Sequence, residues 1–241
     1  MGSKTIPKTS GDSTNSIMCR ILLSVGGRPS GFFKSFIDIS RRDRTMGWSH
    51  GSGWGALWAS REGFGMYKSL RPIWESFVEP PVGYSLYLLH SRLASVGKVA
   101  IENTHPIVFG RYAIAHNGTL DKEGFLAELE RRGVEVGDVA GETDSEILLK
   151  AIVKTGADED AVKEIAEAAR KFIDPEEPLL NFALIDGRGK AYFYTHRQSE
   201  HPHYVPVYAE LGDVVLIASE PLSEDVEWKS LKNGELLTHT Y

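Results

Sequence analysis

The chain has 241 residues, of which 41% are hydrophobic, and this is enough apolar material for one sizeable core or two small ones. Its formal net charge of −6, with no long basic block, argues against a nucleic-acid partner. A single cysteine excludes an intramolecular disulfide and fits a reducing, cytoplasmic location, and no apolar run is long enough to predict a membrane span.

The first residues differ in character from the rest of the chain. Residues 1–17 are rich in Ser, Thr, Gly and Lys and carry no periodic apolar pattern. This composition is typical of a tail, a tag or a pro-segment rather than of a folded core. We therefore expect a tail over 1–18 and a single domain over 19–241.

The first half of the predicted domain contains mainly strands. An apolar strand follows Met18, and a helix is indicated over 30–41 by apolar residues at helical spacing. A loop rich in Gly, Ser, His and Trp is expected over 47–55. Further strands are predicted, from their apolar and aromatic content, at 56–59, 84–90 and 112–115.

The second half predicts three helices and then four strands. The helices are expected at 121–132, 143–154 and 158–172, and Thr143 with Glu146 fits a capping box at the start of the second. The strands are expected at 179–185, 191–195, 204–208 and 214–218, with a hairpin turn at 186–189. Because most links are of hairpin length, this order favours an α+β fold of antiparallel sheets with helices packed outside.

Four segments place a chemically useful residue where a strand or helix begins or ends. Cys19 opens the first strand, Arg92 closes another, Asn117-Gly118 follows a third, and Asp144 lies at the start of a helix. A thiolate can attack a carboxamide carbon, and the Asn117 and Gly118 N–H groups can stabilise the resulting oxyanion. Arg92 can bind an α-carboxylate and Asp144 an α-ammonium group. Together these groups describe the binding of glutamine and the cleavage of its side-chain amide.

Each feature also has an ordinary structural interpretation. Cys19 fits a buried strand, Arg92 a surface cation, and Asn117-Gly118 a turn. The histidines of the same region, at 90, 105 and 116, lack the tight spacing of metal ligands, so we expect no metal site. It is the ordered set of four segments that indicates an enzyme.

The ordered motifs resemble those of the class II glutamine amidotransferases. They are Met18-Cys19, His90-Ser91-Arg92, Asn103-Thr104-His105-Pro106, Ala115-His116-Asn117-Gly118-Thr119 and Thr143-Asp144-Ser145-Glu146. Ser219-Glu220-Pro221-Leu222, with Trp228 beyond it, is similar to the closing segment of the short, stand-alone members. The resemblance extends from Met18 to about Trp228.

The resemblance implies a four-layer αββα sandwich of the N-terminal-nucleophile (Ntn) hydrolases and a reaction without a cofactor. It implies that Cys19 is the nucleophile, with its own α-amine as the base, and that Asn117 and Gly118 are the oxyanion donors. The substrate-binding residues that it implies are Arg92, Asp144, His116, Trp54 and Gly55. Since the amine must be free, any segment before Cys19 must be removed for this chemistry.

The expected reaction is hydrolysis of glutamine to glutamate and ammonia through a γ-glutamyl thioester. We expect a separate synthase or synthetase subunit to accept the ammonia, because the hydrolase fold uses the residues after Met18. Three alternatives remain open at this point. In the first, the substrate is another γ-glutamyl compound that is simply hydrolysed. In the second, His116 serves as a papain-style base, which tolerates an extension before Cys19. In the third, the protein is a catalytically silent binding module blocked by its tail.

Overall fold

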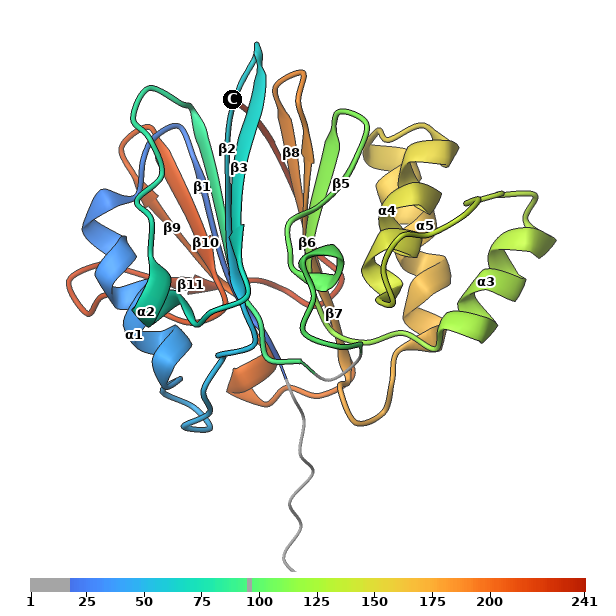
Figure 1. Ribbon diagram of the computed structural model, residues 1–241, viewed down its shortest axis with the longest axis horizontal. Helices are drawn as coiled ribbons and strands as arrows, with labels where there is room; N and C mark the ends of the chain where they lie inside the picture. The colour runs from blue at the N-terminus through green and yellow to red at the C-terminus, as the bar shows by residue number, and fades with distance from the viewer. Residues whose placement is uncertain (1–17, 95–96) are drawn as a thin grey trace, which may run out of the picture.

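The computed structural model describes residues 18–94 and 97–241, which form four layers (Figure 1). Two β-sheets stack face to face, and helices cover the outer face of each sheet. Helices α1 (Phe33–Arg41) and α2 (Ile73–Ser76) cover the first sheet; α3 (Lys122–Arg131), α4 (Asp144–Thr155) and α5 (Glu159–Ala169) cover the second. The αββα architecture is therefore confirmed. The tail expected over 1–18 lies, apart from Met18, outside the described residues.

The sheets contain seven and five strands, and all strand pairs among the described residues are antiparallel. The first sheet has the order β11-β9-β10-β1-β4-β2-β3, with β1 (Arg20–Val25), β2 (Trp54–Ser60), β3 (Gly63–Ser69), β4 (Leu86–Ser91), β9 (Val207–Leu211), β10 (Val214–Ala218) and β11 (Lys229–Ser230). The second has the order β12-β8-β7-β6-β5, with β5 (Ile107–Phe109), β6 (Tyr112–Asn117), β7 (Leu179–Asp186), β8 (Lys190–Arg197) and β12 (Leu236–Thr240). Single 3₁₀ turns lie at η1 (Ser30–Phe32), η2 (Ile101–Asn103), η3 (Arg170–Phe172) and η4 (Pro202–Tyr204).

Strands β1, β4, β6 and β7 are buried at every position, which explains why they are mostly apolar. Successive side chains of a strand point to opposite sides of its sheet. In β1, Ile21 and Leu23 face the cluster between the two sheets, whereas Leu22 faces the cluster under α1. In the second sheet, Ala183 of β7 faces the first sheet and Phe182 packs toward α4 and α5.

The strand register brings the ends of several strands to one end of the sandwich. Arg20, the first residue of β1, pairs with Ser91, the last residue of β4, and Trp54 at the start of β2 pairs with the same Ser91. Cys19 and Arg92 are therefore neighbours although 73 positions separate them in the sequence. Asn117 ends β6 in the facing sheet and reaches across to Cys19.

The predicted helices are confirmed with small changes at their ends, and several strand limits are corrected. The loop expected over 47–55 ends earlier, because β2 begins at Trp54. The strand expected at 204–208 begins at Val207, because Pro202–Tyr204 forms a 3₁₀ turn with proline in its first position. The edge strand β3 was not predicted; it contains Gly65, where a Cβ would collide with the indole of Trp58.

The capping box predicted at the start of α4 is wrong. Thr143 is the N-cap residue, but its side chain makes no capping hydrogen bond. The Glu146 carboxylate instead accepts hydrogen bonds from Ala140 N and Gly141 N, each at 2.9 Å, and pairs with Lys150 at 2.8 Å. Glu146 therefore holds the segment before the helix, at Ala140 and Gly141, and does not bind the backbone N–H of the N-cap residue Thr143.

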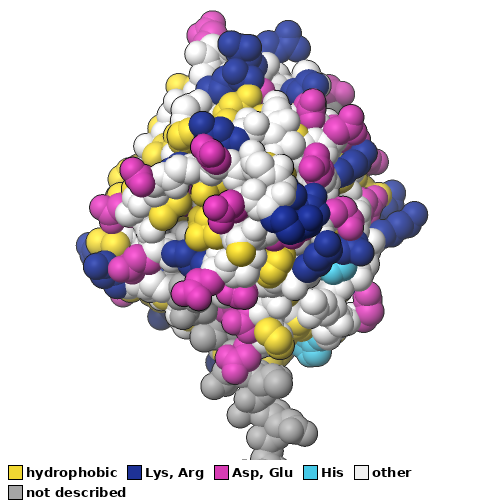
Figure 2. All heavy atoms as spheres, turned by 90° about the vertical axis from the view of Figure 1, so that its right-hand side faces the viewer, with side chains coloured by type: hydrophobic (Ala, Val, Ile, Leu, Met, Phe, Trp, Pro, Cys, Tyr) yellow, Lys and Arg dark blue, Asp and Glu magenta, His cyan; other side chains and the backbone are white. Residues whose placement is uncertain are grey.

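The outer face formed by α3, α4 and α5 is a mixed-charge surface. Figure 2 shows acidic and basic side chains interspersed over it. Several of them pair along one helix, as Arg131 does with Glu128 and Lys163 with Glu159. Within the described parts of the chain, no helix has the length and apolar character needed to cross a bilayer.

The cluster between the sheets should carry a large share of the folding free energy. Leu88 of β4 is fully buried in it, whereas Leu70 is 40% exposed. We expect Leu88→Ala to lower the free energy of unfolding by about 2–5 kcal/mol, because it removes buried methyl groups and leaves a cavity. Urea unfolding measures this, with Leu70→Ala as the matched control. Equal losses in the two variants would contradict the assignment of the core.

Candidate active site

Cys19 lies immediately before β1 and is half-buried. Its Sγ accepts a hydrogen bond from Leu93 N at 3.4 Å and lies 3.5 Å from Leu93 O, to which the thiol donates. Burial raises the pKa of the thiol to about 12, and the charge of Glu177 adds to this effect. The Leu93 N–H and the cations Arg92 and Arg20 lower the pKa but do not compensate. In the chain as described, the sulfur is therefore a neutral thiol at pH 7.

The main-chain carbonyl of Cys19 is held by two donors from different parts of the fold. Asn117 Nδ2 donates to it at 2.9 Å and Arg20 Nη1 at 3.2 Å. Asn117 Nδ2 also contacts Ser219 Oγ at 3.3 Å, and Ser219 Oγ accepts from Ile21 N at 2.9 Å. The position of Cys19 is thus fixed from both sheets at once.

A small cavity of about 30 Å³ lies beside Cys19. It brings together five of the residues predicted from the sequence: Cys19, Arg92, His116, Gly118 and Asp144. Its volume is that of a space for one or two water molecules. The predicted side chains therefore converge on one point, and a substrate of the size of glutamine must replace contacts that they now make.

Arg92 follows β4 and is almost fully buried. Its Nη1 donates to Lys98 O at 3.1 Å, and its Nη2 donates to Gly97 O at 3.3 Å. Burial lowers the pKa of the guanidinium, and the neighbouring Cys19 and Glu142 oppose this effect. An arginine remains a cation under such conditions, so Arg92 supplies a fixed positive charge beside the cavity.

Asp144 supplies a carboxylate on the other side of the cavity. It is the first residue of α4, and its Oδ2 accepts from Leu120 N at 2.8 Å and lies 3.8 Å from His116 Nδ1. Burial raises the pKa of Asp144, while His116 and the Leu120 N–H lower it. A negative charge at a helix N-terminus is also favoured by the helix dipole.

His116 points from β6 toward α4, where its Nδ1 lies 3.1 Å from Ser145 Oγ. Burial lowers its pKa, so the ring is neutral at pH 7. Gly118, two residues later, has φ = +121°, and a Cβ there would collide with Leu179 O. Only glycine fits this position, and its backbone can approach a ligand closely for the same reason.

Trp54 and Gly55, expected to border the substrate pocket, are not among the residues that line the cavity at Cys19. Trp54 is fully buried in the cluster under α1 and α2, and its Nε1 donates to Ser76 Oγ at 2.9 Å. Gly55 is packed directly under the His105-Pro106 segment, where a Cβ would collide with His105 O. The structure therefore places both residues in the framework behind the site.

A buried charge cluster around Arg20 was not found from the sequence. Arg20 Nη2 lies 3.0 Å from Asp43 Oδ2 and 3.2 Å from His203 Nδ1, and His50 Nε2 lies 3.2 Å from the same Asp43 oxygen. Burial opposes the charge on Asp43, but His50 and Arg20 outweigh it and hold its pKa below the ordinary range. This cluster fixes the guanidinium that holds the Cys19 carbonyl.

Two further histidines beside the cavity were not assigned a role. The rings of His90 and His105 lie 4.4 Å apart, both are buried, and their ring nitrogens have no hydrogen-bond partner among the described residues. Burial lowers the pKa of His90 to about 3 and that of His105 well below its usual value. In the described residues, no three His, Cys, Asp or Glu side chains are placed to hold a metal ion.

Comparison with known proteins bears on the family and the fold of this chain. The family model described as class II glutamine amidotransferases matches residues 18–209. The Escherichia coli (strain K12) protein YafJ, whose name proposes a glutamine amidotransferase, is 27% identical and aligns with 90% of this chain and 96% of its own length. A Haemophilus influenzae protein with the same proposed activity is 25% identical, over 90% of this chain and 83% of its own.

Solved structures show the same fold at low sequence identity. Glutamine phosphoribosylpyrophosphate amidotransferase from B. subtilis superposes with a TM-score of 0.67 at 20% identity, over 91% of this chain and 47% of that one. This chain therefore spans about half the length of that enzyme. A class II domain protein from Silicibacter pomeroyi superposes with a TM-score of 0.57 at 20% identity, over 91% of this chain and 94% of that one.

The buried histidines should make the fold sensitive to acid. Burial lowers the pKa of His50 to about 4 and those of His90 and His203 to about 3. Below about pH 6.5 the unfolded chain binds protons that the folded chain does not, so the free energy of unfolding should fall as the pH falls. The pKa values of Asp144 and Glu220 are raised, so these two carboxyl groups make the free energy of unfolding rise as the pH falls. They are fewer than the buried histidines, so we expect the effect of the histidines to be the larger one. Urea unfolding between about pH 5 and pH 7 measures how the free energy of unfolding depends on pH. A free energy of unfolding that rises toward pH 5 would contradict this prediction.

Proposed function

The chain belongs to the class II glutamine amidotransferases, and from that premise we propose that it hydrolyses glutamine to glutamate and ammonia with Cys19 as the nucleophile. The observation that carries the proposal is the cavity at which Cys19, Arg92, Gly118 and Asp144 meet. The thiol and the main-chain amide suit the reacting amide of glutamine. The cation and the carboxylate suit the α-carboxylate and the α-ammonium group at its other end. We also propose that residues 1–18 form a tail and residues 19–241 the catalytic domain.

The proposed chemistry begins with a free α-amine on Cys19. The amine takes the thiol proton, and the thiolate attacks the amide carbon of glutamine to form a tetrahedral oxyanion. The C–N bond then breaks, ammonia leaves with the transferred proton, and a γ-glutamyl thioester remains. Water attacks the thioester, which releases glutamate and restores the thiol and the amine.

Removal of the residues before Cys19 is a physical requirement of this mechanism. A peptide nitrogen has no useful basicity, whereas an α-amine has a pKa of about 7.7–8.0. With the peptide bond in place, the pKa of the buried thiol is about 12, and very little thiolate exists at pH 7. Met18, the last residue to be removed, packs with Leu179 and Tyr204 and is almost fully buried.

The charged head of the substrate is proposed to lie between Arg92 and Asp144. The α-carboxylate would compete with the carbonyls of Gly97 and Lys98 for the Arg92 guanidinium. The α-ammonium group would pair with Asp144, whose Oδ2 already accepts from Leu120 N. Both anchors suit any γ-glutamyl compound, because such compounds share the same head.

Asn117 and Gly118 are proposed as the oxyanion donors. Gly118 offers a main-chain N–H at the cavity wall. Asn117 Nδ2 is bonded to Cys19 O and Ser219 Oγ in the described chain. It must therefore exchange one of these bonds for the oxyanion, and loss of one such donor typically costs about 3–4 kcal/mol of barrier.

The released ammonia is proposed to pass to an acceptor outside the residues of this domain. The B. subtilis protein that shares this fold is about twice as long and is a glutamine phosphoribosylpyrophosphate amidotransferase. By analogy, a separate synthase or synthetase subunit would consume the ammonia made here. Coupled assays with candidate subunits, measuring glutamine-dependent product, test this part of the proposal.

Trimming should switch the activity on. A chain that begins at Cys19 is expected to release glutamate from glutamine at least about 100-fold faster than the full chain, because a general base contributes about 10²–10⁴-fold. A coupled glutamate assay on both proteins measures this, with Cys19→Ala in the trimmed chain as the inactive control. Equal rates for the two chains would contradict the α-amine mechanism and favour His116 as the base.

Weakened anchors should impair substrate binding more than turnover. Arg92→Lys keeps the charge but loses the two-pronged hydrogen bonding, and Asp144→Asn removes the charge while keeping an acceptor for Leu120 N. We expect each change to raise KM for glutamine at least about tenfold, equivalent to about 1.4 kcal/mol. The exposed Arg71, changed to Lys, is the matched control. An unchanged KM in both site variants would refute the assignment of the anchors.

A further inference from the structure

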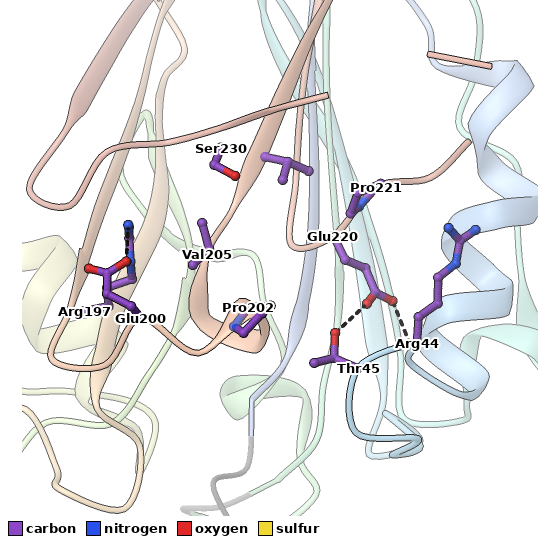
Figure 3. A pocket seen from close by; sticks show the side chains of 10 residues that line it. Arg44, Thr45, Arg197, Glu200, Pro202, Val205, Glu220, Pro221 and Ser230 are labelled. Carbon is purple, nitrogen blue, oxygen red and sulfur yellow. Dashed lines mark hydrogen bonds and ion pairs between the residues drawn. The ribbon is translucent and has the colours of Figure 1, made fainter. Parts of the chain in front are cut away.

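A second and larger cavity lies apart from the Cys19 cavity. It has a volume of about 550 Å³, which is within the usual range for small-molecule sites. It lies between the loop after α1 and the segment that joins β8 to β9 (Figure 3). It is lined by Arg44, Thr45, Arg197, Glu200, Pro202, Val205, Val207, Glu220, Pro221 and Ser230.

Glu220 provides a buried carboxylate in the wall of this cavity. The residue is 6% exposed, and its oxygens accept from Arg44 N at 3.2 Å and from Thr45 Oγ1 at 3.4 Å. Both donors are neutral, and Glu220 has no ion-pair partner within 4.0 Å among the described residues. Burial raises its pKa, and the nearby charge of Arg20 opposes this effect. A buried carboxylate with only neutral donors is stabilised by any cation that approaches it.

The charged side chains that line the cavity are Arg44, Arg197, Glu200 and Glu220, and Arg197 and Glu200 pair with each other. Arg197 Nη2 pairs with Glu200 at 2.9 Å, and Arg197 Nη1 donates to Leu231 O at 3.2 Å. Figure 3 shows this pair on the wall opposite Glu220, and it shows the Arg44 side chain extending away from the Glu220 carboxylate. Much of the remaining surface is apolar and is contributed by proline and valine side chains.

We propose that this cavity binds a small organic cation, an alkylamine or a guanidine. Its charged head pairs with Glu220, and its alkyl chain lies on Val205, Pro202 and Pro221. The buried Glu220 carboxylate favours a cationic head, and the apolar wall favours a chain of several carbons over a bare ammonium ion. The site is distinct from the Cys19 cavity, since the two share no lining residue.

The hydrogen bonds of Glu220 connect this site to Cys19. Arg44 and Thr45, which donate to Glu220, directly follow Asp43, and Asp43 pairs with Arg20 at 3.0 Å. Arg20 in turn donates to the Cys19 carbonyl. A cation at Glu220 therefore acts on the loop that holds Arg20, and we expect its binding to change the reactivity of the Cys19 thiol. The change requires only that the cation bind one arrangement of this loop better than another.

Calorimetric titration of the full-length protein with n-butylamine tests the site. We expect saturable binding that is at least about tenfold weaker in Glu220→Gln, a loss equivalent to about 1.4 kcal/mol. The control variant is Glu227→Gln, an exposed residue of the same segment outside the cavity, which should bind like the parent. The control ligand is 1-butanol, which has the same chain without the charge. The proposal would be overturned if butylamine did not bind, or if 1-butanol bound as tightly as butylamine. It would also be overturned if Glu220→Gln and Glu227→Gln bound butylamine with equal affinity.

A second variant and a second readout separate the site from general folding effects. Ser230 is exposed on β11 at the cavity, so Ser230→Trp should block the binding of butylamine while leaving Glu220 unchanged.

The rate at which iodoacetamide alkylates Cys19, the single cysteine, should change at least about threefold when butylamine saturates the parent protein. It should not change in Glu220→Gln. An unchanged rate at saturation would refute the coupling to Cys19. Neither readout requires glutamine hydrolysis, so failure of the proposed reaction would be seen separately.

Discussion

One carbonyl group, that of Cys19, joins the two sheets at the candidate active site. Asn117 at the end of β6 and Arg20 at the start of β1 both donate to it. A nucleophile must be held to within a fraction of an ångström to gain from proximity. Residues on strand ends give this precision because the strands themselves are fixed by pairing and by burial on both faces. The stacking of the two sheets is therefore what positions the chemistry.

This arrangement requires charged groups inside the protein. Burying Arg20 is costly unless its charge is paired, and Asp43 provides that pair with help from His50. The neighbouring histidines avoid the same cost by remaining neutral, since burial lowers the pKa values of His50, His90 and His203. The result is a fixed environment in which Arg92 and Asp144, of opposite charge, both line one small cavity. Such an environment strengthens the electrostatic recognition of a zwitterionic head.

The sequence predicted those parts of the structure that depend on local pattern. The helices followed from apolar spacing, and the convergence of Cys19, Arg92 and Asp144 followed from the family motifs. The Arg20 cluster could not be found in this way, because Arg20 and His203 are 183 positions apart and no spacing rule links them. The one available signal was the presence of an arginine in an otherwise apolar strand. Trp54 and Gly55 were placed at the pocket by the family resemblance, which indicates a loop near the site but does not say which of its side chains reach the Cys19 cavity.

The two cavities differ in volume, and it is the chemistry of the lining side chains, not the volume, that makes the smaller one the candidate catalytic centre. The larger cavity, beside Glu220, does not include Cys19 in its lining. At the smaller one, about 30 Å³ beside Cys19, the charged side chains already have partners: Arg92 donates to the carbonyls of Gly97 and Lys98, and Asp144 accepts from the Leu120 N–H. A ligand can enter only if it replaces these contacts with equivalents of its own. A molecule that lacked the carboxylate or the ammonium group would leave a buried charge unpaired, and that penalty is a physical basis for selecting a γ-glutamyl head.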